Sequence, residues 1–274
     1  MNEKVSMLKE KAKELRKTAL TMIFEAQPGH PGGSLSSADI VTALYFSEMH
    51  VDPKNPQWPD RDRFVLSKGH VCPIQYAALG SLGFFPEEVL HTLRQEGSML
   101  QGHPSMLKCP GIDISTGSLG QGASCAVGMA LAGKRDHKDY RVFTLLGDGE
   151  MDEGIVWEAM MSANRYRLDN FVIIVDNNGL QLDGPCDQIM PHIGLSAKAA
   201  AFGFEVYDID GHDMQQILDA FDKIRAAKNG KPKFINAKTV KGKGVDFMEN
   251  QVSWHGTAPN AEQYADAIAQ IDRS

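Results

Sequence analysis

The chain has 274 residues, of which 42% are hydrophobic and 23% charged, and its formal net charge is −7. This composition excludes a disordered or fibrous chain, and the length suffices for one large domain without a metal or disulfide staple. The negative charge argues against nucleic-acid binding. Apolar runs such as residues 171–175 are far shorter than the roughly 20 residues of a membrane-spanning helix, so no membrane anchoring is expected.

The cysteines and the N-terminus indicate the compartment. Cys72, Cys109, Cys125 and Cys186 show no CxxC spacing, which predicts buried or incidental thiols and no zinc site. The N-terminal segment mixes both charges without an apolar core, unlike a signal or transit peptide. A reducing cytoplasm is therefore expected.

The N-terminal part predicts helices followed by one short strand. Apolar residues at helical spacing predict a helix over residues 2–26, and the prolines and glycines of residues 27–33 should break it. A second helix is expected over residues 38–49, and a strand over residues 64–66.

From about residue 112 strands and helices alternate. A glycine-rich turn at residues 116–122 opens a small-residue helix that extends to about residue 133. Further strands are predicted at residues 141–146, 171–175, 204–209 and 233–239, with helices at 154–167 and 214–228. Apolar strands without alternation, separated by helices, indicate a parallel sheet covered on both faces. The sequence thus predicts one α/β domain with a doubly wound, mainly parallel sheet.

Two polar side chains follow neighbouring predicted strands. Asp148 lies in the GDG turn after one strand, and Asn178 follows the next strand thirty residues later. Parallel strands joined by a helix end at the same edge of a sheet, where doubly wound proteins bind ligands. A carboxylate and an amide oxygen suit magnesium or calcium, and magnesium held by so few carboxylates usually completes its coordination with phosphate oxygens. The pattern favours a metal–diphosphate site, although ordinary turns would use the same residues.

The glycine-rich turn has two interpretations of similar weight from the residues alone. Free N–H groups at a helix entrance can hold a polar or anionic ligand. The same glycines could serve only a turn and close helix packing.

The GDG turn followed after a helix by Asn177-Asn178 resembles the signature of thiamin diphosphate enzymes. Further segments resemble transketolases along nearly the whole chain. They are QPGHPGGSLSSADI (27–40), FVLSKGH (64–70), QGHP (101–104), GIDISTGSLGQG (111–122), DGHD (210–213) and VSWHGTAP (252–259). The resemblance is to the diphosphate-binding domain of that family.

This resemblance implies that residues 1–274 form a single thiamin diphosphate-binding domain, and that the pyrimidine-binding and C-terminal domains are absent. The chain is similar to the N-terminal subunit of a split transketolase. A C-terminal partner subunit would carry the pyrimidine-binding domain with its catalytic glutamate, in an α2β2 assembly.

The resemblance also implies a set of cofactor-binding positions. Asp148, Asn178 and the backbone oxygen of Leu180 match the Mg²⁺ ligands, and Ca²⁺ can substitute for Mg²⁺. His70, Gly149 and Asn178 match groups near the diphosphate. The matches beneath the cofactor rings are Gly117, Ser118 and Leu119.

Three histidines match the family's sugar-facing positions. They are His30, His103 and His255, and His255 also matches a position close to the cofactor. Each alone could equally be a structural histidine, but imidazoles suit the proton movements of ketol transfer.

Charged residues near these motifs have less specific interpretations. Glu153 and Glu158 match acidic positions at the family's dimer contact, and a solvated helix face is the alternative. Lys238, Lys241 and Lys243 could meet a phosphate, but an exposed flexible loop is expected.

The implied activity is transfer of a two-carbon ketol unit from a ketose phosphate to an aldose phosphate. Ser118 stands where many family members have proline, and the GHPGGSL segment and Trp254 also differ from common full-length transketolases. Three alternatives remain open: a specialised sugar transketolase, a 2-oxo acid dehydrogenase alpha subunit, and a non-catalytic regulatory subunit.

Overall fold

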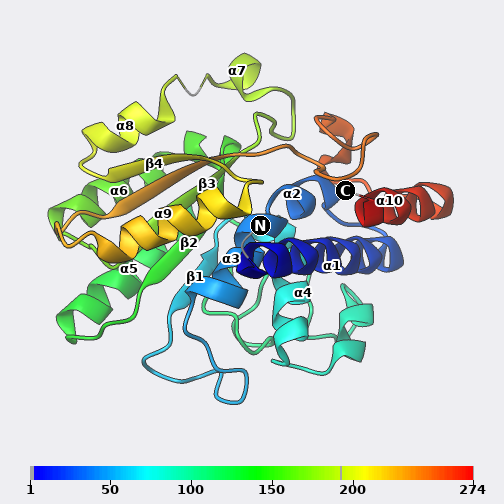
Figure 1. The fold of residues 1–274 in the computed structure, drawn as a ribbon, viewed down its shortest axis with the longest axis horizontal. Coiled ribbons are helices and arrows are strands. Elements are labelled where there is room, and N and C mark those ends of the chain that lie inside the picture. Colours follow the sequence, from blue (N-terminus) through cyan, green and yellow to red (C-terminus); the bar gives the residue numbers. More distant parts are fainter. Residues whose placement is uncertain (1–2, 192, 274) are drawn as a thin grey trace.

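Residues 3–191 and 193–273 are described by the computed structural model (Figure 1). Five strands form one parallel sheet in the order β1-β2-β3-β5-β4. The strands are β1 (Arg63–Leu66), β2 (Val142–Gly147), β3 (Phe171–Asn177), β4 (Glu205–Asp210) and β5 (Lys233–Lys238). The predicted doubly wound α/β fold is confirmed.

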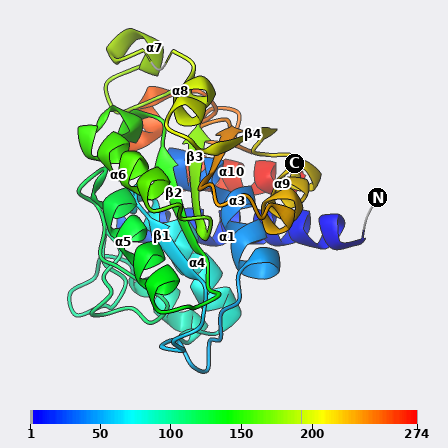
Figure 2. The ribbon, with the colours of Figure 1, turned by 90° about the vertical axis from the view of Figure 1, so that its left-hand side faces the viewer.

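Ten α-helices lie in the described residues. They are α1 (Glu3–Ala26), α2 (Pro31–Ser36), α3 (Ala38–Ala43), α4 (Cys72–Leu82), α5 (Gln121–Arg135), α6 (Gly154–Arg165), α7 (Cys186–Ile189), α8 (Leu195–Ala201), α9 (Met214–Ala226) and α10 (Ala261–Arg273). Helices cover both faces of the sheet, with α5 and α6 on one side and α1, α3 and α9 on the other (Figure 2).

Successive residues of the central strands enter two different hydrophobic cores. In β2, Phe143 and Leu145 join the core beneath α1, α3, α4 and α9, whereas Val142 and Leu146 join the core beneath α5 and α6. Because both faces are buried, apolar residues predominate at successive positions of β2 and β3. This burial explains the lack of alternation in the sequence.

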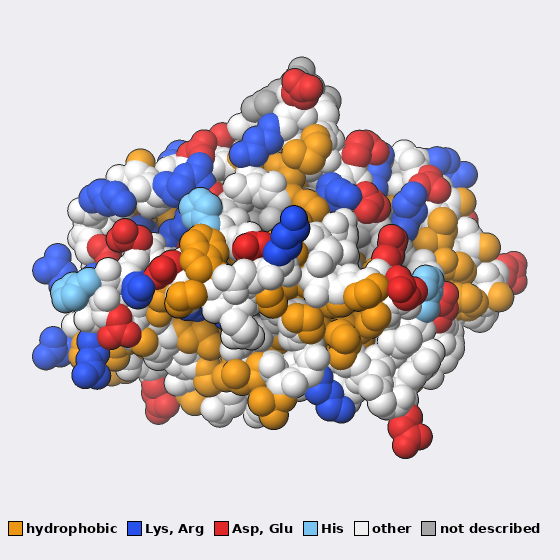
Figure 3. All heavy atoms as spheres, turned by 90° about the horizontal axis from the view of Figure 1, so that it is seen from below, with side chains coloured by type: hydrophobic (Ala, Val, Ile, Leu, Met, Phe, Trp, Pro, Cys, Tyr) orange, Lys and Arg blue, Asp and Glu red, His pale blue; other side chains and the backbone are white. Residues whose placement is uncertain are grey.

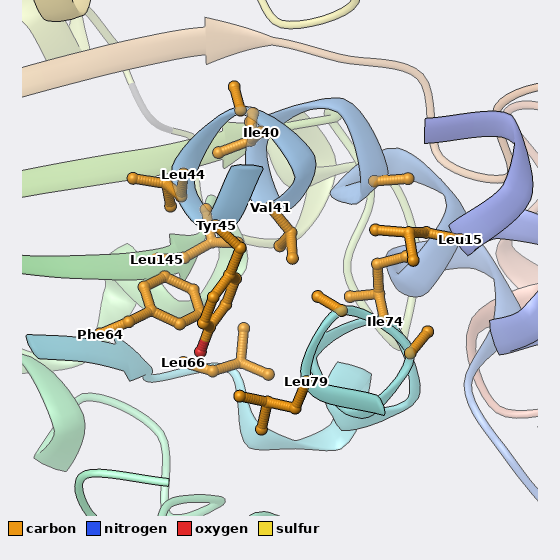
Figure 4. Packing of buried hydrophobic residues seen from close by; sticks show 14 of the residues in the cluster. Leu15, Ile40, Val41, Leu44, Tyr45, Phe64, Leu66, Ile74, Leu79 and Leu145 are labelled. Atoms are coloured by element: carbon orange, nitrogen blue, oxygen red, sulfur yellow. The ribbon is translucent and has the colours of Figure 1, made fainter. Parts of the chain in front are cut away.

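The larger core joins the N-terminal helices to the edge of the sheet (Figure 4). The ring of Tyr45 packs edge-on against Phe64 of β1, with ring centroids 5.6 Å apart. Leu15 of α1 and Ile74 of α4 belong to the same cluster. This packing joins residues on both sides of α2 to the sheet, and α2 directly follows His30.

The predicted break after the first helix is confirmed, because α1 ends at Ala26, but two local details near the N-terminus differ from the prediction. The chain resumes helical structure at Pro31, inside the segment expected to break it, because proline's fixed φ suits the first helical position. The helix expected over residues 38–49 is α-helical only to Ala43, and the residues after it, Leu44–Glu48, form a π-helical turn.

The surface carries no single dominant charge on the face seen in Figure 3, where acidic and basic side chains are interspersed with apolar ones. Cys72, Cys109 and Cys186 are buried, as expected, whereas Cys125 on α5 is exposed. Within the described residues, no helix has the length and apolar character needed to cross a bilayer.

Candidate active site

A cavity of about 260 Å³ opens where the parallel strands end. Most of the predicted site residues line it: His30, His70, Gly117, Leu119, Asp148, Gly149, Asn178, Leu180 and His255. Ser118 is exposed beside it, and His103 is exposed, with its ring packed against Gly117. The topology therefore gathers segments that are far apart in the sequence.

Asp148 and Asn178 form the polar floor of this cavity. The Asp148 carboxylate, which is 2% exposed, accepts hydrogen bonds from the backbone N–H groups of Gly149, at 2.9 Å, and Gly179. Burial, followed by the nearby Asp176 carboxylate, raises the pKa of Asp148 above its usual value. A bound cation would relieve this cost of holding the carboxylate ionised.

The donor set fits a hard divalent cation. Asp148 offers carboxylate oxygens, Asn178 an amide oxygen and Leu180 a backbone oxygen, all of which suit Mg²⁺ or Ca²⁺. No group of three His, Cys, Asp or Glu side chains in the described part of the chain could hold a metal. A cation here would thus depend on amide, backbone and ligand oxygens.

Two polar atoms of the cavity wall point to a polar ligand. His30 Nδ1 and Gln181 Nε2 are buried and have no hydrogen-bond partner among the described residues. Buried polar atoms are nearly always paired in folded proteins. Their presence in the wall fits a cavity shaped for a polar cofactor or substrate.

Three imidazoles, those of His30, His70 and His255, meet in this wall as a histidine triangle. Their ring centroids are 5.1 to 5.5 Å apart. Burial, followed by neighbouring positive groups, lowers the pKa of His30 to about 4 and that of His255 to about 3. Burial also lowers the pKa of His70 well below its usual value. All three are neutral at pH 7, so each can both donate and accept a hydrogen bond.

Lys241 contradicts the expectation of an exposed flexible loop. Its side chain is part of the cavity wall and the residue is 3% exposed. Its ammonium donates to the backbone oxygen of Leu180 at 3.0 Å and contacts His255 Nδ1 at 2.8 Å. Burial, with Lys68 nearby, lowers the pKa of Lys241 to about 8. Lys238 is exposed and Lys243 half-buried, so only one of the three lysines faces the cavity.

A buried polar cluster around Asp176 lies behind the metal-binding positions and was missed in the sequence. The Asp176 carboxylate is completely buried and pairs with Lys68. It also accepts from the hydroxyls of Ser36, at 2.6 Å, and of Thr239. Burial alone would raise the pKa of Asp176, but Lys68 and the hydroxyl donors outweigh it and lower the pKa.

Glu150 is a second buried acid that the sequence did not reveal. Its carboxylate accepts from the Ser67 hydroxyl, from the Gly120 N–H at 2.8 Å and from the Gly147 N–H at 3.2 Å. It therefore joins the ends of β1 and β2 to the entrance of α5. An acidic residue two positions after Asp148 was visible in the sequence, but its burial was not.

The glycine-rich turn before α5 has the conformation that its composition suggests. Gly117 has φ +135° and Gly120 has φ +80°, both in the region that favours glycine. A Cβ on Gly117 would lie 2.5 Å from the His103 ring, so glycine here lets that histidine approach the cavity.

The two acidic residues after the GDG turn lie outside the cavity. Glu153, the N-cap residue of α6, and Glu158, on the outer face of that helix, are both exposed. Their proposed part in a dimer contact stays a prediction.

The family description "Transketolase, thiamine diphosphate binding domain" matches residues 7–271. The chain is 45% identical to the 6-deoxy-6-sulfo-D-fructose transketolase subunit SqwG of Clostridium sp. (strain MSTE9), over 100% of this chain and 99% of that protein. It is 42% identical to an apulose-4-phosphate transketolase subunit of Phocaeicola vulgatus, over 97% of this chain and 94% of that protein.

Solved structures of transketolases are also similar to this chain. Transketolase from Campylobacter jejuni superposes with a TM-score of 0.92 at 36% identity, over 99% of this chain but only 43% of that one. Transketolase from Leishmania mexicana gives a TM-score of 0.91 at 31% identity, again over only 41% of its chain. The chain thus spans less than half of these proteins and nearly all of the relatives named as subunits. It belongs to the thiamin diphosphate-binding domain family of transketolases and is an N-terminal transketolase subunit.

Proposed function

We propose that this chain and a C-terminal partner subunit transfer a two-carbon ketol unit from a ketose phosphate to an aldose phosphate, using thiamin diphosphate and Mg²⁺. The observation that carries the proposal is the single cavity that gathers Asp148, Asn178, Leu180 and the histidine triangle. The cavity therefore offers both hard oxygen ligands and neutral imidazoles.

The metal–diphosphate end of the cofactor is assigned to the polar floor. Asp148, Asn178 Oδ1 and the Leu180 backbone oxygen would hold Mg²⁺, while His70, Gly149 and Asn178 would lie beside the diphosphate. Ca²⁺ has the same preference for oxygen ligands and would substitute. When bound, thiamin diphosphate supplies the electron sink for breaking a carbon–carbon bond beside a carbonyl.

The sugar is assigned to the histidine side of the cavity. His30 and His255, from the triangle, and His103 at the rim would hold the hydroxyl and carbonyl oxygens of the sugar. A neutral imidazole donates from one nitrogen and accepts at the other, which suits proton movement between such oxygens. Gly117, Ser118 and Leu119 would form the surface beneath the cofactor rings.

A separate C-terminal subunit is proposed to supply the pyrimidine-binding part of the site. Relatives that this chain covers almost completely are named as subunits, whereas it covers 43% of the Campylobacter jejuni transketolase. Exposed apolar side chains on two loops, Leu107 at 90% and Ile193 at 82%, are available for such a contact. We propose one domain in this chain, an α2β2 assembly and a cytoplasmic location.

A specialised sugar is the second candidate substrate class. Two subunit relatives are named for sulfofructose and for apulose 4-phosphate, which favours a donor other than the common pentose phosphates for this chain as well. The differences at Ser118 and Trp254 agree with this candidate. The ketol-transfer chemistry is the same in both cases.

The test is a reconstitution with the C-terminal subunit, Mg²⁺ and thiamin diphosphate. A panel of donor ketoses and 2-oxo acids, with aldose acceptors, should give two-carbon transfer from a ketose only. Oxidative decarboxylation of a 2-oxo acid would instead identify a dehydrogenase subunit. Absence of cofactor binding in calorimetry of the reconstituted pair would identify a regulatory subunit.

The lone chain gives the complementary measurement. One positioned acid–base group contributes about 10²- to 10⁴-fold to a rate, and the lone chain would lack one together with half of the pocket. It should therefore show no measurable transfer from xylulose 5-phosphate. Turnover at the rate of the reconstituted pair would refute the shared site.

A further inference from the structure

Lys241 connects two parts of the cavity that are assigned to different ligands. Its ammonium donates to the backbone oxygen of Leu180 at 3.0 Å, on the metal-binding side. The same nitrogen lies 2.8 Å from Nδ1 of His255, a member of the histidine triangle. The residue is 3% exposed, so water does not compete effectively for these contacts.

The chemistry of the two groups sets the direction of the second hydrogen bond. A lysine ammonium has three N–H donors and no acceptor, so Nδ1 of His255 must be the acceptor. A neutral imidazole that accepts at Nδ1 carries its proton on Nε2. The contact therefore selects one of the two tautomers of His255.

We propose that Lys241 is a positioning residue that fixes His255 in the Nε2–H tautomer, so that its second ring nitrogen acts as a hydrogen-bond donor within the histidine triangle. His70 and His30 lie 5.2 and 5.5 Å from the His255 ring, centroid to centroid. Without the ammonium, either ring nitrogen of His255 could carry the proton.

The link to Leu180 gives this arrangement a second consequence. Two of the three ammonium donors are used by the Leu180 oxygen and His255, and the third can reach an anionic ligand in the cavity. Any change in the position of the Leu180 oxygen would act directly on the ammonium that orients His255. Lys241 thus couples the diphosphate side to the sugar side.

Another histidine in the same chain has the opposite arrangement and serves as an internal reference. His212 Nε2 accepts from the Val240 backbone N–H at 2.9 Å, so its proton must be on Nδ1, which contacts Asp39 at 2.8 Å. His212 should therefore be the Nδ1–H tautomer whichever residue occupies position 241.

The test is NMR of the full chain with ¹⁵N-labelled histidine, in which couplings from the ring protons to each nitrogen identify the tautomer. His255→Gln and His212→Gln assign the two signals. In the wild type we expect Nε2–H at His255 and Nδ1–H at His212. Finding Nδ1–H at His255 in the wild type would overturn the proposal without any variant.

Variants of Lys241 test the cause. Lys241→Met keeps most of the side chain but removes the ammonium donors. A charged hydrogen bond is strong enough that the tautomer ratio at His255 should change about tenfold or more. Lys241→Arg retains donors and should keep Nε2–H. Lys238→Met removes an exposed lysine near the same loop and should change nothing.

An unchanged His255 spectrum in folded Lys241→Met would reject Lys241 as the cause, and loss of folding would leave the wild-type and Lys241→Arg spectra to decide. The inference rests on the proposed function only in naming the ligands that His255 and Leu180 face. The tautomer is measured on this chain without partner or cofactor. A wrong tautomer would therefore contradict this inference without bearing on ketol transfer by the reconstituted pair.

Discussion

The side-chain amide of Asn178 donates through Nδ2 to the Asp176 carboxylate, 3.2 Å away. This contact fixes which end of the amide faces the cavity, because the NH₂ group is held by the buried acid. The opposite end, Oδ1, accepts from the Leu180 N–H at 3.1 Å and keeps a lone pair for a cation. Asp176 therefore orients a predicted metal ligand without being one.

Replacing Asn178 tests its assignment as a metal ligand. Asn178→Leu keeps the volume but removes the oxygen. The affinity of the reconstituted pair for thiamin diphosphate with Mg²⁺ should fall by at least about 10- to 100-fold, the loss typical of changing residues that merely support a metal ligand. Calorimetry measures the loss. The neighbouring Asn177, whose amide donates to Asn236 at 2.9 Å, provides the control, and Asn177→Leu should bind normally. Equal losses in both variants would contradict the assignment.

The buried ion pair behind the cavity should matter more for stability than an exposed one. Lys68→Met leaves Asp176 without its cationic partner, and removal of one member of a buried pair costs about 3–5 kcal/mol. Urea unfolding of the lone chain measures this free energy. Lys134→Met, in the exposed pair with Asp169, should cost less than about 1 kcal/mol. Similar costs for the two variants would show that the Asp176 cluster does not depend on Lys68.

The histidine triangle predicts a pH dependence of stability. Unfolded histidines bind protons below about pH 6.5, whereas folded His30 and His255 do so only near pH 4 and 3. Between these values the unfolded state binds more protons, so the free energy of unfolding should fall as pH decreases from 6.5 towards 4.

Urea unfolding at several pH values measures this slope. His255→Gln should reduce the slope by up to one proton, since one depressed group is removed. A slope that is independent of His255 would show that its folded and unfolded pKa values are similar.

Gly117 should tolerate no side chain. Gly117→Ala forces a Cβ at φ +135° and 2.5 Å from His103, and we expect a loss of about 1–3 kcal/mol in the free energy of unfolding. The His103 ring should also be displaced, which a crystal structure of the variant would show. Gly128→Ala on α5, where a Cβ meets nothing within 4 Å, should stabilise by up to about 1 kcal/mol. Tolerance of both changes would contradict the tight packing of the turn.

The sequence predicted the sheet well because the central strands β2 and β3 are mostly apolar and end in recognisable turns. All five strands lie within one or two residues of their expected bounds. Helix α4 was missed because its residues from Cys72 to Gly80 are all buried, and no polar face marks a helical period.

Site residues that belong to a recognisable motif were predictable from the sequence. Residues whose role depends on being buried by distant segments were not. Asp148 and Asn178 follow the ends of strands, and the parallel topology brings them together as expected. Lys241 was assigned to an exposed loop because its neighbours are glycines and lysines, yet the chain folds back so that it contacts Leu180, far earlier in the sequence. Similarly, the pairing of Lys68 with Asp176 joins positions 108 residues apart, and no local pattern shows such a contact.

The exposed thiol of Cys125 provides a labelling site for measuring assembly. The other three cysteines are buried, and burial raises the pKa of each of those thiols to about 12, which suppresses their reactivity. A maleimide dye would therefore attach selectively to the α5 surface, away from the cavity. Fluorescence from that one position would then report the arrival of a second polypeptide chain at α5 directly, with no catalytic turnover required.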